Sequence, residues 1–300
     1  MKNKYRNIFL AFGIVAVLIM MFTFDMDYQE LWTNLKRAGI YLPLVLILWL
    51  LVYLINTVSW YIIIRSGGKP GFSFARLYKF TVTGFALNYV TPVGLMGGEP
   101  YRIMELKPYI GVERATSSVI LYVMMHIFSH FCFWLTSVLL YIFLYPVGWG
   151  MGIILGAITI FCLLIALLFI KGYQHGMAVA FVRLGSRLPF LKKKVIHFAE
   201  VHREQLENID QQIALLHRQK KQTFYAALSL EYMARVVSCL EIWLILNVLT
   251  THVSFADCCL IAAFSSLLAN LLFFLPMQLG GREGGFALAV GGLSLSGAYG

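Results

Sequence analysis

The chain has 300 residues, of which 60% are hydrophobic and only 13% are charged. Soluble globular domains carry about 25% charged residues, so this composition excludes an ordinary water-soluble protein. The formal net charge of +10 would suit a nucleic-acid binder, but the basic residues lie in the loops between apolar runs, as at the cytoplasmic face of a membrane protein. These apolar runs are about 17–25 residues long, enough to cross the ~30 Å hydrocarbon core of a bilayer.

The first part of the chain predicts two membrane spans. Basic residues precede an apolar run over residues 8–24 that no cleavage site follows, so we expect a retained span rather than a secretory signal. A short amphipathic connection over residues 31–40 leads to a second span over residues 42–64. This span ends in a basic turn at Arg65 and Lys69, which the positive-inside rule places in the cytoplasm.

Residues 74–108 contain a broken helix. An apolar helix meets Pro92, runs through three glycines and restarts at Pro100. Proline removes a backbone donor and glycine releases the helix, and such irregular backbone is tolerated in a membrane only where it is buried in protein or lines a cavity. Basic residues flank the break on both sides, so we expect the segment to enter the membrane and return to the cytoplasm.

The middle of the chain predicts two further spans and a connector. A span over residues 115–145 is expected to run outward, and one over residues 151–170 to return. Residues 171–222 are polar and basic, with an apolar stripe at three- and four-residue steps. This pattern predicts an amphipathic helix on the cytoplasmic face.

The last part of the chain predicts one more outward span, over residues 224–249, and a second broken helix after residues 255–275. The apolar run from Phe286 to Gly300 is shorter than a membrane span requires. We therefore expect the last helix to continue beyond Gly300.

The second broken helix repeats the pattern of the first. Glu99 lies seven residues beyond Pro92, Glu283 lies seven residues beyond Pro276, and each interval contains a Gly-Gly pair. The basic residues place the first break at the cytoplasmic face and the second at the outer face, so the two would be related by inversion. We therefore predict an all-α polytopic membrane protein with about six spans and two broken, re-entrant helices related as an inverted repeat.

A single transmembrane domain is expected over residues 1–300, with repeat-like halves at 42–145 and 223–300 and the amphipathic connector at 171–222. In this topology twenty of the 24 Lys and Arg residues fall on the cytoplasmic side. The remaining four are Lys36 and Arg37 outside, and Arg235 and Arg282 at membrane depth. This asymmetry predicts a protein of the cytoplasmic (inner) membrane with its N-terminus in the cytoplasm.

Paired broken helices are the best sequence indication of a transporter's binding site. The glycine amides and the positive ends of the restarted helices suit an anionic headgroup, and arginines would add fork-shaped donors. The two glutamates would repel a phosphate, so we expect them to hold a proton, a cation or an amine; helix capping is the alternative for Glu99. The candidate substrate-binding residues are Asn88, Thr91, Pro92, Gly97, Gly98, Glu99, Arg102, Asn270, Pro276, Gly280, Gly281, Arg282 and Glu283.

Ionisable residues within spans are costly and indicate a functional site. The spacing of Glu231, Arg235 and Glu241 places them on one face of a helix. Two interpretations are open: a structural ion pair between Glu231 and Arg235, or a ladder of charges that lines a pathway for the headgroup. His126 and His130 share a face of another span; polar packing or a proton relay is favoured over a metal site, which would need a third ligand. These five residues form the predicted intramembrane polar pathway, and no metal or other cofactor is expected.

These motifs resemble the lysylphosphatidylglycerol synthase transmembrane-region family, whose members are often called flippase-like. The resemblance rests on Asn88, Thr91-Pro92, Gly97-Gly98-Glu99-Pro100-x-Arg102, Pro276 and Gly280-Gly281-x-Glu283-Gly284. It implies a membrane region that moves a lipid across the bilayer, which in the large members follows a soluble aminoacyl-transfer domain. No such domain lies within these residues, so the resemblance implies no lysyl transfer here. The chain departs from the family pattern at Arg282, where a small residue is typical.

The leading functional hypothesis is translocation (flipping) of a phospholipid or a lipid-linked headgroup across the cytoplasmic membrane. One alternative is a membrane-embedded enzyme acting on a phospholipid or polyprenyl-phosphate headgroup, which would need a nucleophile–base pair or a metal. The other is a non-transporting scaffold that recruits a partner through the amphipathic helix.

The sequence contains no P-loop, so transport is expected to be passive or driven by ions or membrane potential. We expect no enzymatic activity and no catalytic residue. Expected partners are membrane lipids and anionic headgroups at the cytoplasmic face, with a homo-oligomer or a lipid-modifying enzyme as further partners, and no nucleic acid.

Overall fold

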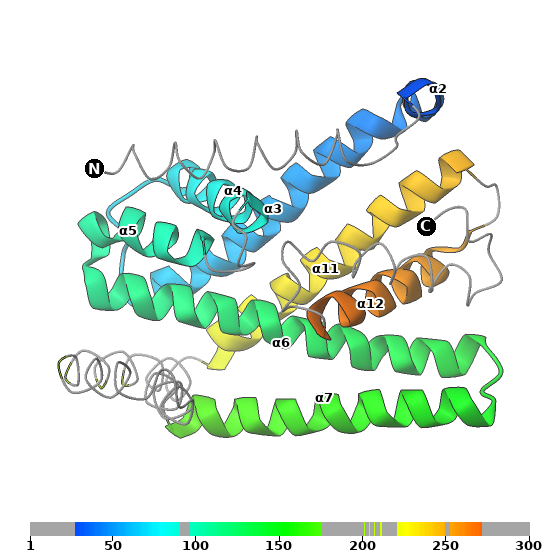
Figure 1. Ribbon diagram of the computed structural model, residues 1–300. Helices are drawn as coiled ribbons and strands as arrows, with labels where there is room; N and C mark the ends of the chain where they lie inside the picture. The colour runs from blue at the N-terminus through cyan, green and yellow to red at the C-terminus, as the bar shows by residue number, and fades with distance from the viewer. Residues whose placement is uncertain are drawn as a thin grey trace. The chain divides into compact units, whose positions relative to one another are not determined.

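The computed structural model describes residues 28–90, 97–175, 221–249 and 253–271, together with positions 201, 204, 207 and 211. All the regular elements in this part of the chain are α-helices (Figure 1), so the predicted all-α class is confirmed. The helices are α2 (Tyr28–Ala38), α3 (Tyr41–Ser66), α4 (Phe74–Val90), α5 (Gly98–Ile110), α6 (Val112–Leu144), α7 (Trp149–His175), α11 (Lys221–Leu249) and α12 (Phe255–Leu271).

Three of the described helices are long and apolar enough to cross a membrane. They are α3 with 26 residues, α6 with 33 residues and the 19 residues Trp149–Leu167 of α7. Leu46 and Ile47 on α3 and Ile153 and Ile160 on α7 are largely exposed, although contiguous apolar surface is rare on soluble proteins. A lipid environment accounts for this exposure, because apolar side chains lose nothing by facing hydrocarbon.

The chain divides into two compact units, and the boundaries between them fall within α3, α4, α5 and α11. The first unit comprises Met1–Leu54, Lys79–Tyr101 and Arg235–Gly300, and the second comprises Ile55–Tyr78 and Arg102–Ala234. The predicted repeat-like halves divide the sequence at other positions, and the inversion between them stays a prediction. The predicted first span and most of the predicted connector lie outside the described residues, although α7 continues as a helix to His175.

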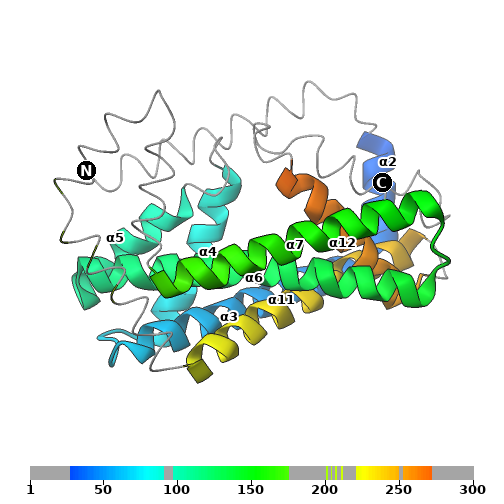
Figure 2. The ribbon, with the colours of Figure 1, turned by 90° about the horizontal axis from the view of Figure 1, so that it is seen from below.

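In the second unit, α6 and α7 lie side by side and run antiparallel (Figures 1 and 2). The turn from α5 into α6 is made by Gly111, whose φ of 80° is favourable only for glycine. Arg114 in the first turn of α6 donates from Nη2 to the carbonyl oxygens of Ile64 and Gly68. It thereby satisfies carbonyls that the end of α3 leaves without a helical partner.

Helices α4 and α5 form an antiparallel hairpin, because contacts between them pair the end of each helix with the start of the other. In the second unit, the side chain of Arg76 donates to the Tyr109 hydroxyl at 2.9 Å. In the first unit, the rings of Phe80 and Tyr101 meet edge to face at 6.4 Å. The chain therefore turns back after α4, and the return of this segment to the cytoplasmic side of the membrane stays a prediction. Helices of 17 and 13 residues are also short for a full crossing, which takes ~20 residues.

Candidate functional site

At the tip of this hairpin, the side chain of Asn88 joins the end of α4 to the start of α5. Its Oδ1 accepts a hydrogen bond from the backbone N–H of Gly98 at 2.7 Å, and its Nδ2 donates to Oε1 of Glu99 at 3.1 Å. The first N–H groups of a helix have no partner within that helix, so Asn88 caps α5 from a neighbouring helix. We call Asn88, Gly98 and Glu99 the clasp. Three of the predicted substrate-binding residues are thus brought together, although ten residues separate Asn88 from Gly98 in sequence.

The clasp depends on the absence of a side chain at Gly98. A Cβ at this position would lie 2.2 Å from the backbone oxygen of Gly84 and 2.8 Å from Oδ1 of Asn88. Real Cβ atoms do not approach a backbone oxygen so closely, so only glycine allows α5 to start against α4. Gly97, which precedes it, is half-buried in a bend.

Arg102, which belongs to the second unit, is only 1% exposed. Its guanidinium carbon lies 5.7 Å from the ring centre of Trp60 and 5.3 Å from that of Tyr122. Cations within about 6 Å of an aromatic face are attracted by the ring quadrupole. The sequence predicts this arginine as a fork-shaped donor to a headgroup; the structure places it against two neighbouring aromatic rings, whose centres are 5.5 Å apart.

The second unit also contains a buried pair between a histidine and a carboxylate. Nδ1 of His126 on α6 lies 2.8 Å from Oε2 of Glu231 on α11. The side chain of Glu231 is 0% exposed, and that of His126 is 29% exposed. A charged side chain at the centre of a membrane helix costs about 2.5–3.5 kcal/mol unless it is compensated, and the imidazole compensates one of the two carboxylate oxygens.

The histidine belongs to a ladder of rings along α6, formed by Tyr122, His126, His130 and Trp134 at four-residue steps. The ring centres of His126 and His130 are 5.6 Å apart and the rings meet edge to face, while His130 and Trp134 are also 5.6 Å apart. Four-residue spacing places these groups one above another on one helix face. Among the described residues, no three His, Cys, Asp or Glu side chains gather as a metal site would require.

The charged residues of the predicted ladder on α11 have the following contacts. Glu231 pairs with His126, and its Oε1 has no hydrogen-bond partner in the described part of the chain. In the first unit, Oε1 of Glu241 accepts from the indole Nε1 of Trp49 at 3.0 Å. The backbone oxygen of Arg235 accepts from Ser238 at 2.7 Å.

The second broken helix lies almost entirely outside the described residues. Asn270 is its first candidate residue, and its Nδ2 donates to the backbone oxygen of Ser266 at 2.7 Å, within α12. The predicted site residues outside the described part of the chain are Thr91, Pro92, Pro276, Gly280, Gly281, Arg282 and Glu283.

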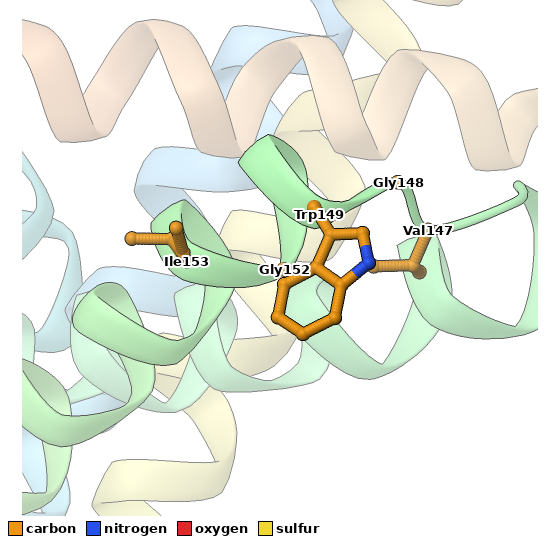
Figure 3. Close-up of a pocket in the computed structure, with 5 residues that line it drawn as sticks. All are labelled: Val147, Gly148, Trp149, Gly152 and Ile153. Atoms are coloured by element: carbon orange, nitrogen blue, oxygen red, sulfur yellow. The ribbon is translucent and has the colours of Figure 1, made fainter.

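A surface hollow of about 350 Å³ lies elsewhere, at the turn between α6 and α7 (Figure 3). It is lined by Val147, Gly148, Trp149, Gly152 and Ile153, with the indole of Trp149 beside Val147. Trp149 is 93% exposed, and an exposed tryptophan at a helix end suits the interface between membrane and water. The hollow offers no charged group and contains none of the predicted site residues.

Sequence analysis missed the aromatic partners of the charged groups. Trp60 and Tyr122 lie within long apolar runs, where an aromatic residue carries no signal of its own. The same holds for Trp49, the donor to Glu241. Tyr122 and Trp134 would have been found by extending the four-residue spacing of His126 and His130 in both directions.

The long apolar helices, with the buried His126–Glu231 pair between two of the described helices, define an integral helical membrane protein. The family model for the lysylphosphatidylglycerol synthase transmembrane region matches residues 8–300. The chain therefore belongs to this family, as its motifs predicted. A comparison with curated proteins and one with solved structures found no match.

Proposed function

We propose that this protein translocates a phospholipid or a lipid-linked headgroup across the cytoplasmic membrane. The observation that carries the proposal is the clasp, in which Asn88 holds the carboxylate of Glu99 at the point where the chain reverses between α4 and α5. Membership of a family named for the membrane region of a lipid synthase supports a lipid as the cargo.

The chemistry of the clasp suits a headgroup with a positive charge. Glu99 lies in the first turn of α5, where the helix dipole stabilises a negative charge. An ammonium group would be attracted to this carboxylate, and the phosphate of the same lipid would be attracted to the amides at the start of α5. In this proposal the hairpin provides a polar binding site within the membrane, so that the headgroup does not have to cross the hydrocarbon unsolvated.

The proposed location is the cytoplasmic membrane with the N-terminus in the cytoplasm. Twenty of the 24 basic residues fall on one side in the predicted topology, and such asymmetry sets the orientation of membrane proteins. The proposed partners are membrane lipids, and we propose no enzymatic step.

The test is lipid translocation by the purified protein in liposomes. Acyl-labelled fluorescent phosphatidylglycerol, phosphatidylethanolamine and lysylphosphatidylglycerol would each be supplied, and the label in the outer leaflet would be bleached with dithionite. Liposomes with the protein should lose the fluorescence of at least one lipid faster than protein-free liposomes. No acceleration for any of the three lipids would contradict the proposed function. Conversion of a lipid to a new product, detected by mass spectrometry, would favour the membrane enzyme instead.

The carboxylate of Glu99 is tested in the same assay by Glu99→Gln, which retains size and hydrogen bonding but removes charge. Translocation should fall about tenfold or more, because a hydrogen bond to a charged group contributes about 1.5–3 kcal/mol. A pure cap would tolerate the change, since an uncharged side chain can also cap a helix. Glu105→Gln is the matched control, because Glu105 lies on the same helix and outside the clasp, and its translocation should equal that of the wild type.

A further inference from the structure

The carboxylate of Glu231 is buried more completely than its interactions explain. Its side chain is 0% exposed, and only Oε2 has a hydrogen-bond partner among the described residues. Oε1 is equally buried and has none. Leaving a buried polar atom without a partner costs about 1–3 kcal/mol, and more for a charged group. A proton on Oε2, shared with Nδ1 of His126, would lower this cost, because a neutral acid is far easier to bury than a carboxylate.

The partner of this carboxylate is connected to the outside of the helix bundle. His126 is 29% exposed although Glu231 is fully buried, so the imidazole is the part of the pair that a proton can reach. His130 extends the connection by one helical turn, with its ring centre 5.6 Å from that of His126. Histidine gains and loses a proton in the physiological range of pH, so two histidines in line form a route for one.

The pair also lies at the centre of its helices. His126 is two residues before the midpoint of α6, residue 128, and Glu231 is four residues before the midpoint of α11, residue 235. Both helices cross the membrane in the predicted topology, which places the pair at membrane depth. A proton held there can be released to either side after a small rearrangement, as alternating access requires.

Other charged and titratable groups lie near the pair among the described residues of the second unit. Tyr122 is one turn away on α6, with Arg102 of α5 over its ring. Tyr232, the neighbour of Glu231, donates from its hydroxyl to Oγ1 of Thr136 on α6 at 3.1 Å. Along α11 the next charged residue is Arg235.

We propose that the His126–Glu231 pair is a proton-binding site that couples lipid translocation to proton movement. The proposal rests on the proposed function and supplies its driving force. Before it binds the transported proton, neutral His126 donates from Nδ1 to the carboxylate, so the pair carries one negative charge and holds α6 to α11 through the 2.8 Å hydrogen bond. When Nε2 of His126 receives a proton from His130, the Nδ1 proton moves to Oε2 of Glu231, and a neutral acid then faces a neutral imidazole. Loss of the carboxylate charge weakens the link between the helices and allows them to rearrange, and the proton leaves on the other side.

The test is translocation of the three labelled lipids in proteoliposomes with and without an imposed pH gradient. A gradient of about one pH unit is about a tenfold difference in proton activity, so one coupled proton can drive up to about a tenfold asymmetry of the labelled lipid between leaflets. Wild-type protein should build such an asymmetry in the gradient and lose it when an ionophore collapses the gradient. Glu231→Gln and His126→Gln should remove the response to the gradient, whether or not slow downhill exchange persists.

Tyr232→Phe is the matched control, because it removes a different hydrogen bond between α6 and α11 and leaves the pair intact. Its response to the gradient should equal that of the wild type. Infrared difference spectra between acidic and alkaline buffer provide an independent readout, in which the wild type should show a protonated-carboxyl band that Glu231→Gln lacks.

Two results would overturn the coupling and leave the proposed function standing. One is wild-type translocation that proceeds at the same rate and to the same distribution with and without the gradient. The other is a Glu231→Gln variant that retains the full response. No translocation of any of the three lipids would instead contradict the proposed function itself, and the coupling with it.

Discussion

Each ionisable group described in the core of the bundle has a particular partner, and the partner decides what the group can do. Arg102 lies against the rings of Trp60 and Tyr122, which attract a cation but exchange no proton with it. Glu231 instead faces an imidazole, which exchanges protons readily. At the scale of single residues, these two charged groups therefore have different surroundings, and only Glu231 has a partner that can exchange a proton with it.

The tight approach at Gly98 leads to a prediction on stability. Gly98→Ala should destabilise the protein by about 1–3 kcal/mol, the usual cost of forcing an extra methyl group into a packed site, because its Cβ would lie 2.2 Å from the oxygen of Gly84. The measurement is the thermal unfolding midpoint in detergent. Gly150→Ala is the control, since nothing lies within 4 Å of a Cβ at Gly150. Equal midpoints for the two variants would show that α4 and α5 do not approach as described.

At the scale of elements, the α4–α5 hairpin is the feature that distinguishes this chain from a simple bundle of spans. Its two helices are tied together at the tip by the clasp and near the open end by Arg76 and Tyr109. The first of these contacts pairs the backbone N–H of Gly98 at the start of α5, and a membrane does not tolerate unpaired backbone groups.

The hairpin predicts that the residues before and after it lie on the same side of the membrane. Lys69 precedes α4, and Lys107 lies in the last turn of α5. The two test variants are Lys69→Cys and Lys107→Cys. With the five native cysteines replaced, both single cysteines should react with a membrane-impermeant maleimide only from the cytoplasmic face. Labelling of the two from opposite faces would mean that the segment crosses the membrane.

At the scale of the whole molecule, orientation follows from where the basic residues lie. Helices α6 and α7 run antiparallel and are joined by a short apolar turn that contains Gly148 and the exposed Trp149. Positive charges instead gather at the opposite ends of these helices, as at Arg114 and Lys171. This arrangement predicts that the turn lies outside and the basic ends lie inside.

The orientation can be measured with two further single cysteines. Gly148→Cys, in the turn between α6 and α7, should be labelled only from outside the cell. Lys193→Cys, in the predicted cytoplasmic connector, should be labelled only after the membrane is permeabilised. The reverse pattern would invert the topology and place the clasp at the outer face.

The sequence by itself determined the helices, the break between α4 and α5, and the family. These features depend on local chemistry: long apolar runs form membrane helices, and proline and glycine interrupt a helix wherever they occur. The candidate residues Asn88, Gly98 and Glu99 could be predicted for the same reason, since each lies at the break.

Only the tertiary structure decided which of these residues meet. Glu231 has Arg235 one turn away on its own helix, and sequence spacing therefore allowed an ion pair. The structure pairs it with His126, which is 105 residues distant, and it pairs Glu241 with Trp49 across 192 residues. Contacts between helices depend on how the helices pack, and the periodicity of one helix shows which face is polar but not which neighbour that face will meet.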